Sequence, residues 1–283
     1  GKSSLLRAIA GLDPVVGGRV VLDGTDVSAL PPEKRRIGLV FQDHALFPHR
    51  RVEQNIAFGL TNLDRAARAR RVDELLELVR LPGVGKRYPH ELSGGEQQRI
   101  ALARALAPDP AVVLLDEPCA SLDPSLRDEV RTDVIDALRL RNAAAVLVTH
   151  DREEALALGD RVAVMSDGRM LQIDRPDEVY ERPSDRFVAT FLGEASFLVD
   201  PDDPSHAMMA RPHDLSLVVE DGGDDRVVAR RYLGAAWRYS VRRADGTDVD
   251  VDLAGRPGSV PLSVGDACTV VVDAGHPLHR LPA

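Results

Sequence analysis

The chain has 283 residues, 44% of them hydrophobic and 29% charged, with a formal net charge of −9 at pH 7. This length suffices for two domains and a substantial core, and the composition is that of an ordinary globular protein. The acidic balance argues against nonspecific nucleic-acid binding, which normally requires a basic face. The longest apolar runs are too short to span a bilayer, no export signal is visible, and two distant cysteines indicate no disulfide framework. These features fit a reducing cytoplasm.

The chain begins Gly1-Lys2-Ser3-Ser4, which matches the second half of a P-loop, G-x-x-x-x-G-K-S/T, followed by its helix. In such a loop the Lys reaches the β- and γ-phosphates and the Ser hydroxyl ligates Mg²⁺. The first five positions of the pattern are absent, and the tripeptide alone is too common to define a site. We expect a fragment of a longer protein or a misassigned start; the alternative is a chain that folds poorly or binds ATP weakly.

Two strands are predicted before residue 42, one within 17–24 and one at 36–41. The second ends at Gln42, in the segment FQDHALFPH, which in isolation is also typical of an aromatic-rich loop covering a core. Apolar residues at helical spacing then predict helices over 52–60 and 66–79.

A capped helix is predicted to begin in the segment LSGGE (92–96). Ser93 and Glu96 form the Ser-x-x-Glu pattern of a capping box. Gly94 and Gly95 leave the first helical N–H groups unshielded, and an open helix N-terminus attracts an anion such as phosphate. A capping box alone is usually only a helix start.

Five apolar residues at 111–115 precede Asp116-Glu117-Pro118. An uninterrupted apolar run predicts a strand buried on both faces, as in a parallel sheet, whose C-terminal edge is where α/β proteins bind ligands. Asp116 could hold Mg²⁺, and Glu117, pointing the other way, could orient or deprotonate a water. The alternative without a functional role is a strand that ends in a polar turn.

A helix over 124–140 and an apolar strand over 143–148 follow, and the strand ends at Thr149-His150-Asp151. If this strand lies in the same parallel sheet, His150 is adjacent to Asp116 and Glu117 and could contact a phosphate or hold water. A lone His in this place is more often a capping or core residue.

These segments together resemble the nucleotide-binding subunit of ABC transporters. LSGGEQQRIALARAL matches the signature motif of that family, VVLLDEP matches its Walker B motif, and ASLD, which ends at Asp123, matches its D-loop. Gln42 matches the Q-loop, and His150 matches the H-loop or switch. The resemblance implies an α/β fold, a P-loop NTPase ABC cassette with a helical subdomain.

The composition changes near residue 193. Residues 176–191 look like the helical segment that ends the cassette of importer-type ATPases; beyond them no lysine occurs, and five short β-like runs are separated by Gly/Asp turns. Five short strands suit a small all-β barrel of the OB type. Arg211-Pro212-His213-Asp214 resembles the opening motif of the TOBE accessory domain of importers. We therefore expect a cassette over 1–192 and an OB-like accessory domain over 193–283.

The resemblance also implies the chemistry. It implies an ATPase that uses ATP and Mg²⁺ and forms a head-to-tail homodimer of cassettes. The implied metal ligands are Ser3, Gln42 and Asp116, with Glu117 as general base and with His150 and Gln42 assisting. The residues implied to contact nucleotide are Gly1, Lys2, Ser3 and Ser4 in one protomer, and Ser93, Gly94, Gly95, Glu96 and Asp123 across the dimer.

The implied role is import. The cassette would work on the cytoplasmic face of the membrane with transmembrane permease subunits and, indirectly, an extracytoplasmic solute-binding protein, without nucleic acid. The accessory motif favours iron, an inorganic anion or a polyamine as cargo, and the short accessory domain disfavours a sugar. One alternative is a truncated cassette that docks without turnover. The other is a non-transport ABC ATPase, disfavoured because the short interval between Lys2 and Ser93 leaves no room for a long coiled coil.

Overall fold

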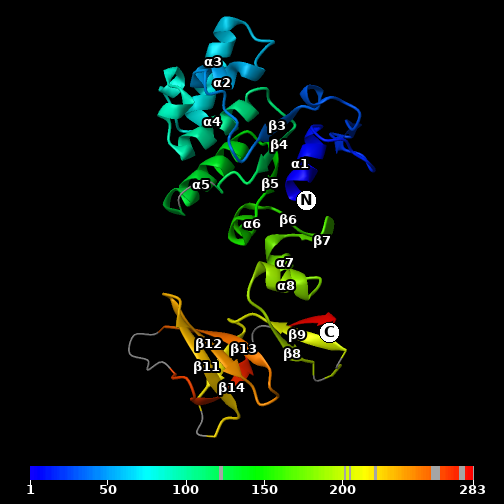
Figure 1. Cartoon of the computed structure of the whole chain (residues 1–283), viewed down its shortest axis with the longest axis vertical. Helices are drawn as coiled ribbons and strands as arrows, with labels where there is room; N and C mark the ends of the chain where they lie inside the picture. Colours follow the sequence, from blue (N-terminus) through cyan, green and yellow to red (C-terminus); the bar gives the residue numbers. More distant parts are fainter. Residues whose placement is uncertain are drawn as a thin grey trace. The chain divides into compact units, whose positions relative to one another are not determined.

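The computed structural model describes residues 1–120, 124–200, 202–203, 205–219, 222–255, 262–273 and 278–282. It consists of two compact units, Gly1–Leu158 and Gly159–Ala283 (Figure 1). Across the described ranges every helix is too short or too polar to cross a membrane.

A three-stranded parallel sheet lies at the centre of the first unit. Its order is β3 (Ile37–Val40), β4 (Val112–Asp116) and β5 (Ala144–Val148). Val40 is level with Leu115, and Asp116 is level with Val148. The residues that follow the three strands therefore meet at one edge, as the predicted parallel sheet requires.

Strand β4 is covered on both faces. Val113 and Leu115 pack into a large core formed with helices α4 (Gly94–Leu106) and α5 (Pro124–Leu140). Val112 and Leu114 instead pack with helix α1 (Lys2–Ala10). Since side chains alternate along a strand, each face of β4 receives its own layer of helices. This is the α/β architecture that the sequence predicts.

Helix α1 is held at its C-terminal end by the buried side chain of Arg35, which is only 5% exposed. Its guanidinium donates hydrogen bonds to the carbonyls of Ala8 (3.0 Å) and Ile9 (2.8 Å). A cation at this end complements the helix dipole and satisfies carbonyls that have no partner within the helix. Arg35 therefore fixes the helix that carries Lys2 and Ser3.

The predicted helices of the subdomain are present. They are α2 (Val52–Ile56), continued by a 3₁₀ turn at Ala57–Gly59, and α3 (Arg65–Leu78). Short 3₁₀ turns at Val84–Lys86 and Pro89–Glu91 lead to α4. The unit is completed by the small hairpin of β1 (Val21–Leu22) and β2 (Thr25–Asp26), a 3₁₀ turn at Pro32–Lys34, and α6 (Arg152–Leu158).

The second unit begins with the hairpin of β6 (Val162–Ser166) and β7 (Arg169–Asp174), followed by α7 (Pro176–Glu181) and α8 (Arg186–Leu192). Its remaining described strands form two antiparallel sheets, of order β10-β14-β11-β12-β13 and β15-β9-β8. The strands of the larger sheet are β10 (Leu215–Val218), β11 (Asp225–Tyr232), β12 (Ala236–Arg242), β13 (Asp248–Ala254) and β14 (Ala267–Val272).

The smaller sheet was missed by the expectation of five strands. It comprises β8 (Ser196–Val199), β9 (His206–Ala210) and β15 (His279–Pro282). The β9 sequence HAMMA has little β-branched character, and β15 contains a proline, so neither has the local preference of a strand. Pairing between segments far apart in the chain, such as His279 with Met209, creates these strands.

Both cysteines are free and buried, at 3% exposed for Cys119 and fully buried for Cys268. Burial, with the nearby charge of Glu154, raises the pKa of the Cys119 thiol to about 12. Burial also raises the pKa of Cys268. Cys119 is therefore a small buried hydrophobe rather than a reactive thiol.

We predict that Ellman's reagent at mildly alkaline pH labels neither thiol of the native chain and both thiols in denaturant. The thiolate is the reactive species, and both sulfur atoms are buried and have raised pKa values. Absorbance of the released chromophore measures the number of thiols. Fast labelling of the native chain would contradict the buried placement of these side chains.

Candidate functional site

The N-terminal helix and the sheet meet at Ser3 and Asp116. The Ser3 hydroxyl donates to Asp116 Oδ1 at 2.9 Å, although the two residues are far apart in the chain. The Lys2 ammonium donates to the backbone carbonyl of Thr149, which directly follows β5. Because α1 packs on β4 through Leu6, these polar side chains lie at the carboxyl edge of the sheet.

Glu117 lies in a tight turn after β4, with a backbone φ of 46°. Its N–H donates to the Val148 carbonyl at 2.8 Å, so the turn is tied to the neighbouring strand. Its carboxylate lies 3.1 Å from Nδ1 of His150, whose side chain is 67% exposed. A left-handed conformation at a residue other than glycine is uncommon and is often found at functional sites. Asp116 and Glu117 thus contact different partners, Ser3 and His150.

The other predicted residues of this edge are exposed. Gln42 lies two residues beyond β3, whose last residue, Val40, is level with Leu115 of β4. Gly1 and Ser4 are exposed at the N-terminal end of α1. Asp123, the predicted D-loop residue, lies outside the described residues.

The signature segment forms the expected capped helix start. The Ser93 hydroxyl accepts from the Glu96 N–H at 3.3 Å, and the Glu96 carboxylate accepts from the Ser93 N–H at 2.7 Å. The hydrogen bond from the Ser93 backbone holds the pKa of Glu96 below its usual value. Ser93 and Gly94 are exposed, whereas Gly95 is buried. A Cβ on Gly95 would lie 3.0 Å from Val130, so this glycine lets α4 approach α5 closely.

A buried ion cluster that we did not predict also joins these two helices. Asp133 of α5, with a side chain 2% exposed, lies 2.7 Å from Arg99 of α4 and 2.6 Å from Arg80. The signal was available, since Asp133 falls on the apolar stripe between Val130 and Val134. Two arginines compensate a carboxylate that would otherwise be costly to bury. The cluster fixes the signature helix against the helix that follows the Walker B strand.

The oxygen atoms of Ser3 and Asp116 suit a hard cation that takes only some of its ligands from the protein. The Ser3 hydroxyl and the Asp116 carboxylate are oxygen ligands of the kind that Mg²⁺ prefers alongside water and phosphate oxygens. Within the described ranges, no cluster of three or more His, Cys, Asp or Glu side chains is arranged to hold a metal alone. The residues present therefore fit a magnesium ion that arrives with a polyphosphate.

Two protein families and a solved structure match this chain. The family described as "ABC transporter" matches residues 1–120, and the family described as "TOBE domain" matches residues 208–278. A solved structure of a dimeric ATP-binding cassette, in a post-hydrolysis state bound to ADP and phosphate, is similar with a TM-score of 0.55 and 30% identity. The match covers 62% of this chain and 81% of the other.

Curated import proteins are also similar to this chain. The spermidine/putrescine import ATP-binding protein PotA of Pseudomonas fluorescens is 54% identical over 200 residues, 70% of this chain and 55% of the relative. The Fe(3+) ions import ATP-binding protein FbpC of Streptomyces coelicolor is 54% identical over 195 residues, 68% of this chain and 56% of the relative. The chain thus spans just over half the length of these two relatives.

The sulfate/thiosulfate import ATP-binding protein CysA of Nocardia farcinica is 46% identical over 280 residues, which are 94% of this chain and 81% of the relative. This match runs through both units of the structure. The predicted resemblance is confirmed: the chain belongs to the ABC transporter family and contains a TOBE domain.

Proposed function

We propose that the chain is the ATP-hydrolysing subunit of an ABC importer. The observation that carries this proposal is the pair of contacts Ser3–Asp116 and Glu117–His150. They bring the P-loop residues, the Walker B carboxylates and the switch histidine, which are distant in sequence, to one edge of the sheet. Phosphoryl transfer requires mainly positioning and charge stabilisation, which such an edge can provide.

Each residue at this edge has a role that its chemistry allows. Lys2 supplies a positive charge for the phosphates, and Ser3, Gln42 and Asp116 supply oxygen ligands for Mg²⁺. When bound, the ion neutralises phosphate charge. Glu117 accepts the proton of the attacking water, and His150, which touches Glu117, holds the water or donates to the γ-phosphate.

A second copy completes the site. The N-terminal end of α4 is open to solvent at Ser93 and Gly94, so it can hold the γ-phosphate of a nucleotide bound to another cassette. The similar solved cassette is dimeric, which supports a head-to-tail homodimer. The proposal assigns Gly95, Glu96 and Asp123 to the same contact with the nucleotide of the other cassette; Asp123 lies outside the described residues.

We assign residues 1–192 to the cassette and 193–283 to the accessory domain. The TOBE match over 208–278 falls inside the second range. Helices α7 and α8, which close the proposed cassette, lie in the compact unit that starts at Gly159. They are thus the connection between the two functional parts of the chain.

An aromatic surface beyond the Q-loop is our proposed contact for the permease. The rings of Phe47 and Phe58 lie 4.7 Å apart, and Phe58 is 51% exposed. The Arg50 guanidinium lies 5.0 Å and 5.1 Å from their centroids. Buried Asn55 accepts from the Phe47 N–H at 2.8 Å and fixes the loop. Exposed aromatic and arginine side chains on a rigid support are typical of interface hot spots.

We predict that Phe58→Ala weakens association with the cognate permease about tenfold or more, since truncating an aromatic anchor removes much of an interface's energy. Phe191→Ala is the matched control, because Phe191 is 44% exposed and belongs to α8. Copurification with the permease in detergent, at graded concentrations, measures the difference. Equal weakening by both variants would exclude a specific role of the Phe58 surface.

Transport of a small ionic solute is the proposed outcome. Relatives are named for import of polyamines, iron and sulfate, the three classes that we expect. The subunit would act at the cytoplasmic face of the membrane, with a permease and, indirectly, an extracytoplasmic solute-binding protein.

The test is release of phosphate from ATP by the purified chain, with Mg²⁺ and with EDTA. We expect turnover that requires Mg²⁺ and that falls when Lys2 is replaced by Ala. A chain that binds the permease but releases no phosphate above the EDTA control would support the docking-only alternative and refute the ATPase proposal.

A further inference from the structure

The carboxylate of Asp151, the residue directly after His150, has two separate tasks. Oδ1 accepts from the N–H groups of Glu153 (3.0 Å) and Glu154 (3.2 Å) and so caps helix α6. Oδ2 lies 2.5 Å from Nη2 of Arg131 on α5. The backbone next to His150 is therefore held to the start of one helix and to the side of another.

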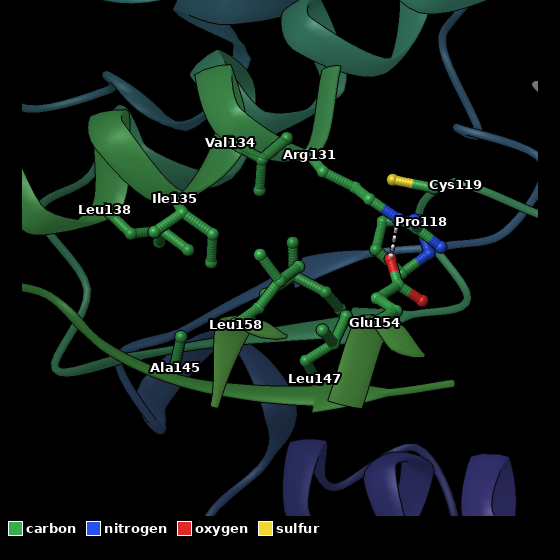
Figure 2. A pocket seen from close by; sticks show the side chains of 11 residues that line it. Pro118, Cys119, Arg131, Val134, Ile135, Leu138, Ala145, Leu147, Glu154 and Leu158 are labelled. Atoms are coloured by element: carbon green, nitrogen blue, oxygen red, sulfur yellow. Dashed lines mark ion pairs between the residues drawn. The ribbon is translucent and has the colours of Figure 1, made fainter. Parts of the chain in front are cut away.

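Arg131 also reaches the first turn of α6 directly. Its Nε lies 3.5 Å from Oε1 of Glu154, whose side chain is 3% exposed, while Arg131 itself is 12% exposed. Figure 2 shows the guanidinium of Arg131 between helix α5 and Glu154 of α6, beside Pro118 and Cys119. The ion pairs of Arg131 thus bridge α5, the turn that carries His150, and the first turn of α6.

The interior beside this bridge is not closely packed. A cavity of about 30 Å³ lies between α5, β5 and α6, and Cys119, Arg131 and Glu154 belong to its lining (Figure 2). A cavity wall loses the dispersion contacts that close packing would supply. Arg127 also pairs with Asp151 Oδ2, but at 3.8 Å, whereas Arg131 lies at 2.5 Å. We therefore expect the ion pairs of Arg131 to be the stronger side-chain anchor of the turn next to His150.

We propose that Arg131 is a positioning residue for the switch: by holding Asp151 and Glu154 it keeps His150 against Glu117. This inference rests on the proposed ATPase function. Among the described residues, Arg131 makes no ion pair with Glu117 or His150, and it acts through the backbone of the β5–α6 turn. It also transmits any movement of α5 to the switch.

Four full-length variants test the proposal. Arg131→Gln removes the charge, Arg131→Lys keeps it without the forked geometry, and Asp151→Asn keeps a good helix cap but weakens the ion pair. Arg139→Gln is the control, because Arg139 is an exposed arginine on the same helix. Two quantities are measured in each: kcat and KM for ATP, and hydrogen exchange of the amides of Glu153 and Glu154.

We expect Arg131→Gln to speed exchange at both amides and to lower kcat roughly 10- to 100-fold with KM changed less than about threefold, as for a misplaced catalytic group. Arg131→Lys should restore most of kcat. The kcat of Asp151→Asn should lie between the values of Arg131→Gln and Arg131→Lys. Arg139→Gln should match the native chain in every measurement. A purely structural role would lower the fraction of active protein without rescue by Lys.

Unchanged exchange in Arg131→Gln and Asp151→Asn would overturn the anchoring. Faster exchange with native kcat would overturn the positioning role. A native chain without ATPase activity would instead refute the proposed function, and exchange at Glu153 and Glu154 would then decide the anchoring alone. If Arg131→Gln does not fold, Asp151→Asn carries the same test.

Discussion

Replacement of Glu117 by Gln should lower the rate of ATP hydrolysis by at least about a hundredfold, because general-base catalysis contributes a factor of that order and a neutral amide cannot take the proton. Gln has nearly the same shape and can keep a hydrogen bond to His150, which lies 3.1 Å from the carboxylate. Nucleotide binding should therefore persist. Phosphate release under steady-state conditions measures the loss, and binding of a fluorescent ATP analogue measures what remains.

The same variant should accumulate as a dimer when ATP is present. If the cassettes close around ATP and separate after hydrolysis, blocking hydrolysis stops the cycle in the closed state. Light scattering after gel filtration should show twice the monomer mass with ATP and the monomer mass with ADP. Glu129→Gln, an exposed residue of α5, is the matched control and should cycle normally. A Glu117→Gln chain that hydrolyses ATP at the native rate would refute the role of Glu117 as base.

Local chemistry predicted the elements that depend on neighbouring residues. The capping box of Ser93 and Glu96 marks the start of α4 because both partners lie within one turn. The apolar run before Asp116 marks β4 because a strand buried on both faces needs no alternation. With the resemblance, these two elements were enough to anticipate the sheet edge where Ser3, Asp116 and His150 lie.

Interactions between distant segments could not be read in the same way. Arg131 and Arg35 look like ordinary charged residues, and only the packed structure shows that each is partly or fully buried with partners. Strands β9 and β15 likewise exist because tertiary pairing overrides weak local preference. A charge on an apolar helical stripe, as at Asp133, is the signal that a sequence can still offer.

The second large effect concerns stability and the buried side chain of Arg211 in the second unit. It is 2% exposed and donates to the carbonyls of Tyr180 (2.7 Å), Ala189 (2.9 Å) and Glu194 (3.1 Å). Its guanidinium also lies 4.1 Å from the Tyr180 ring centroid. One residue from the turn after β9 thus joins α7, α8 and the segment that follows them. The arginine of the Arg-Pro-His-Asp motif therefore has a structural role, because it connects these segments.

Arg211→Met should lower the free energy of unfolding of the second unit by about 3–5 kcal/mol, because it leaves several buried carbonyls without a donor. Trp237, the single tryptophan of the chain, lies in β12 and packs on the core of this unit, so its fluorescence reports this unit specifically. A urea titration followed by Trp237 emission should show the midpoint shift, while the far-ultraviolet signal of the helix-rich first unit shifts less.

Arg242→Met is the control for this experiment. Arg242 pairs with Asp248 at 2.8 Å on the same sheet, but both side chains are more than half exposed. Exposed ion pairs are screened by water, so this variant should change the midpoint little. Equal shifts in the two variants would mean that the Arg211 joint adds nothing beyond an ordinary surface charge. A large shift in Arg211→Met alone would establish that helices α7 and α8 unfold together with the β-sheets, because two of the three carbonyls that lose their donor, those of Tyr180 and Ala189, belong to these helices.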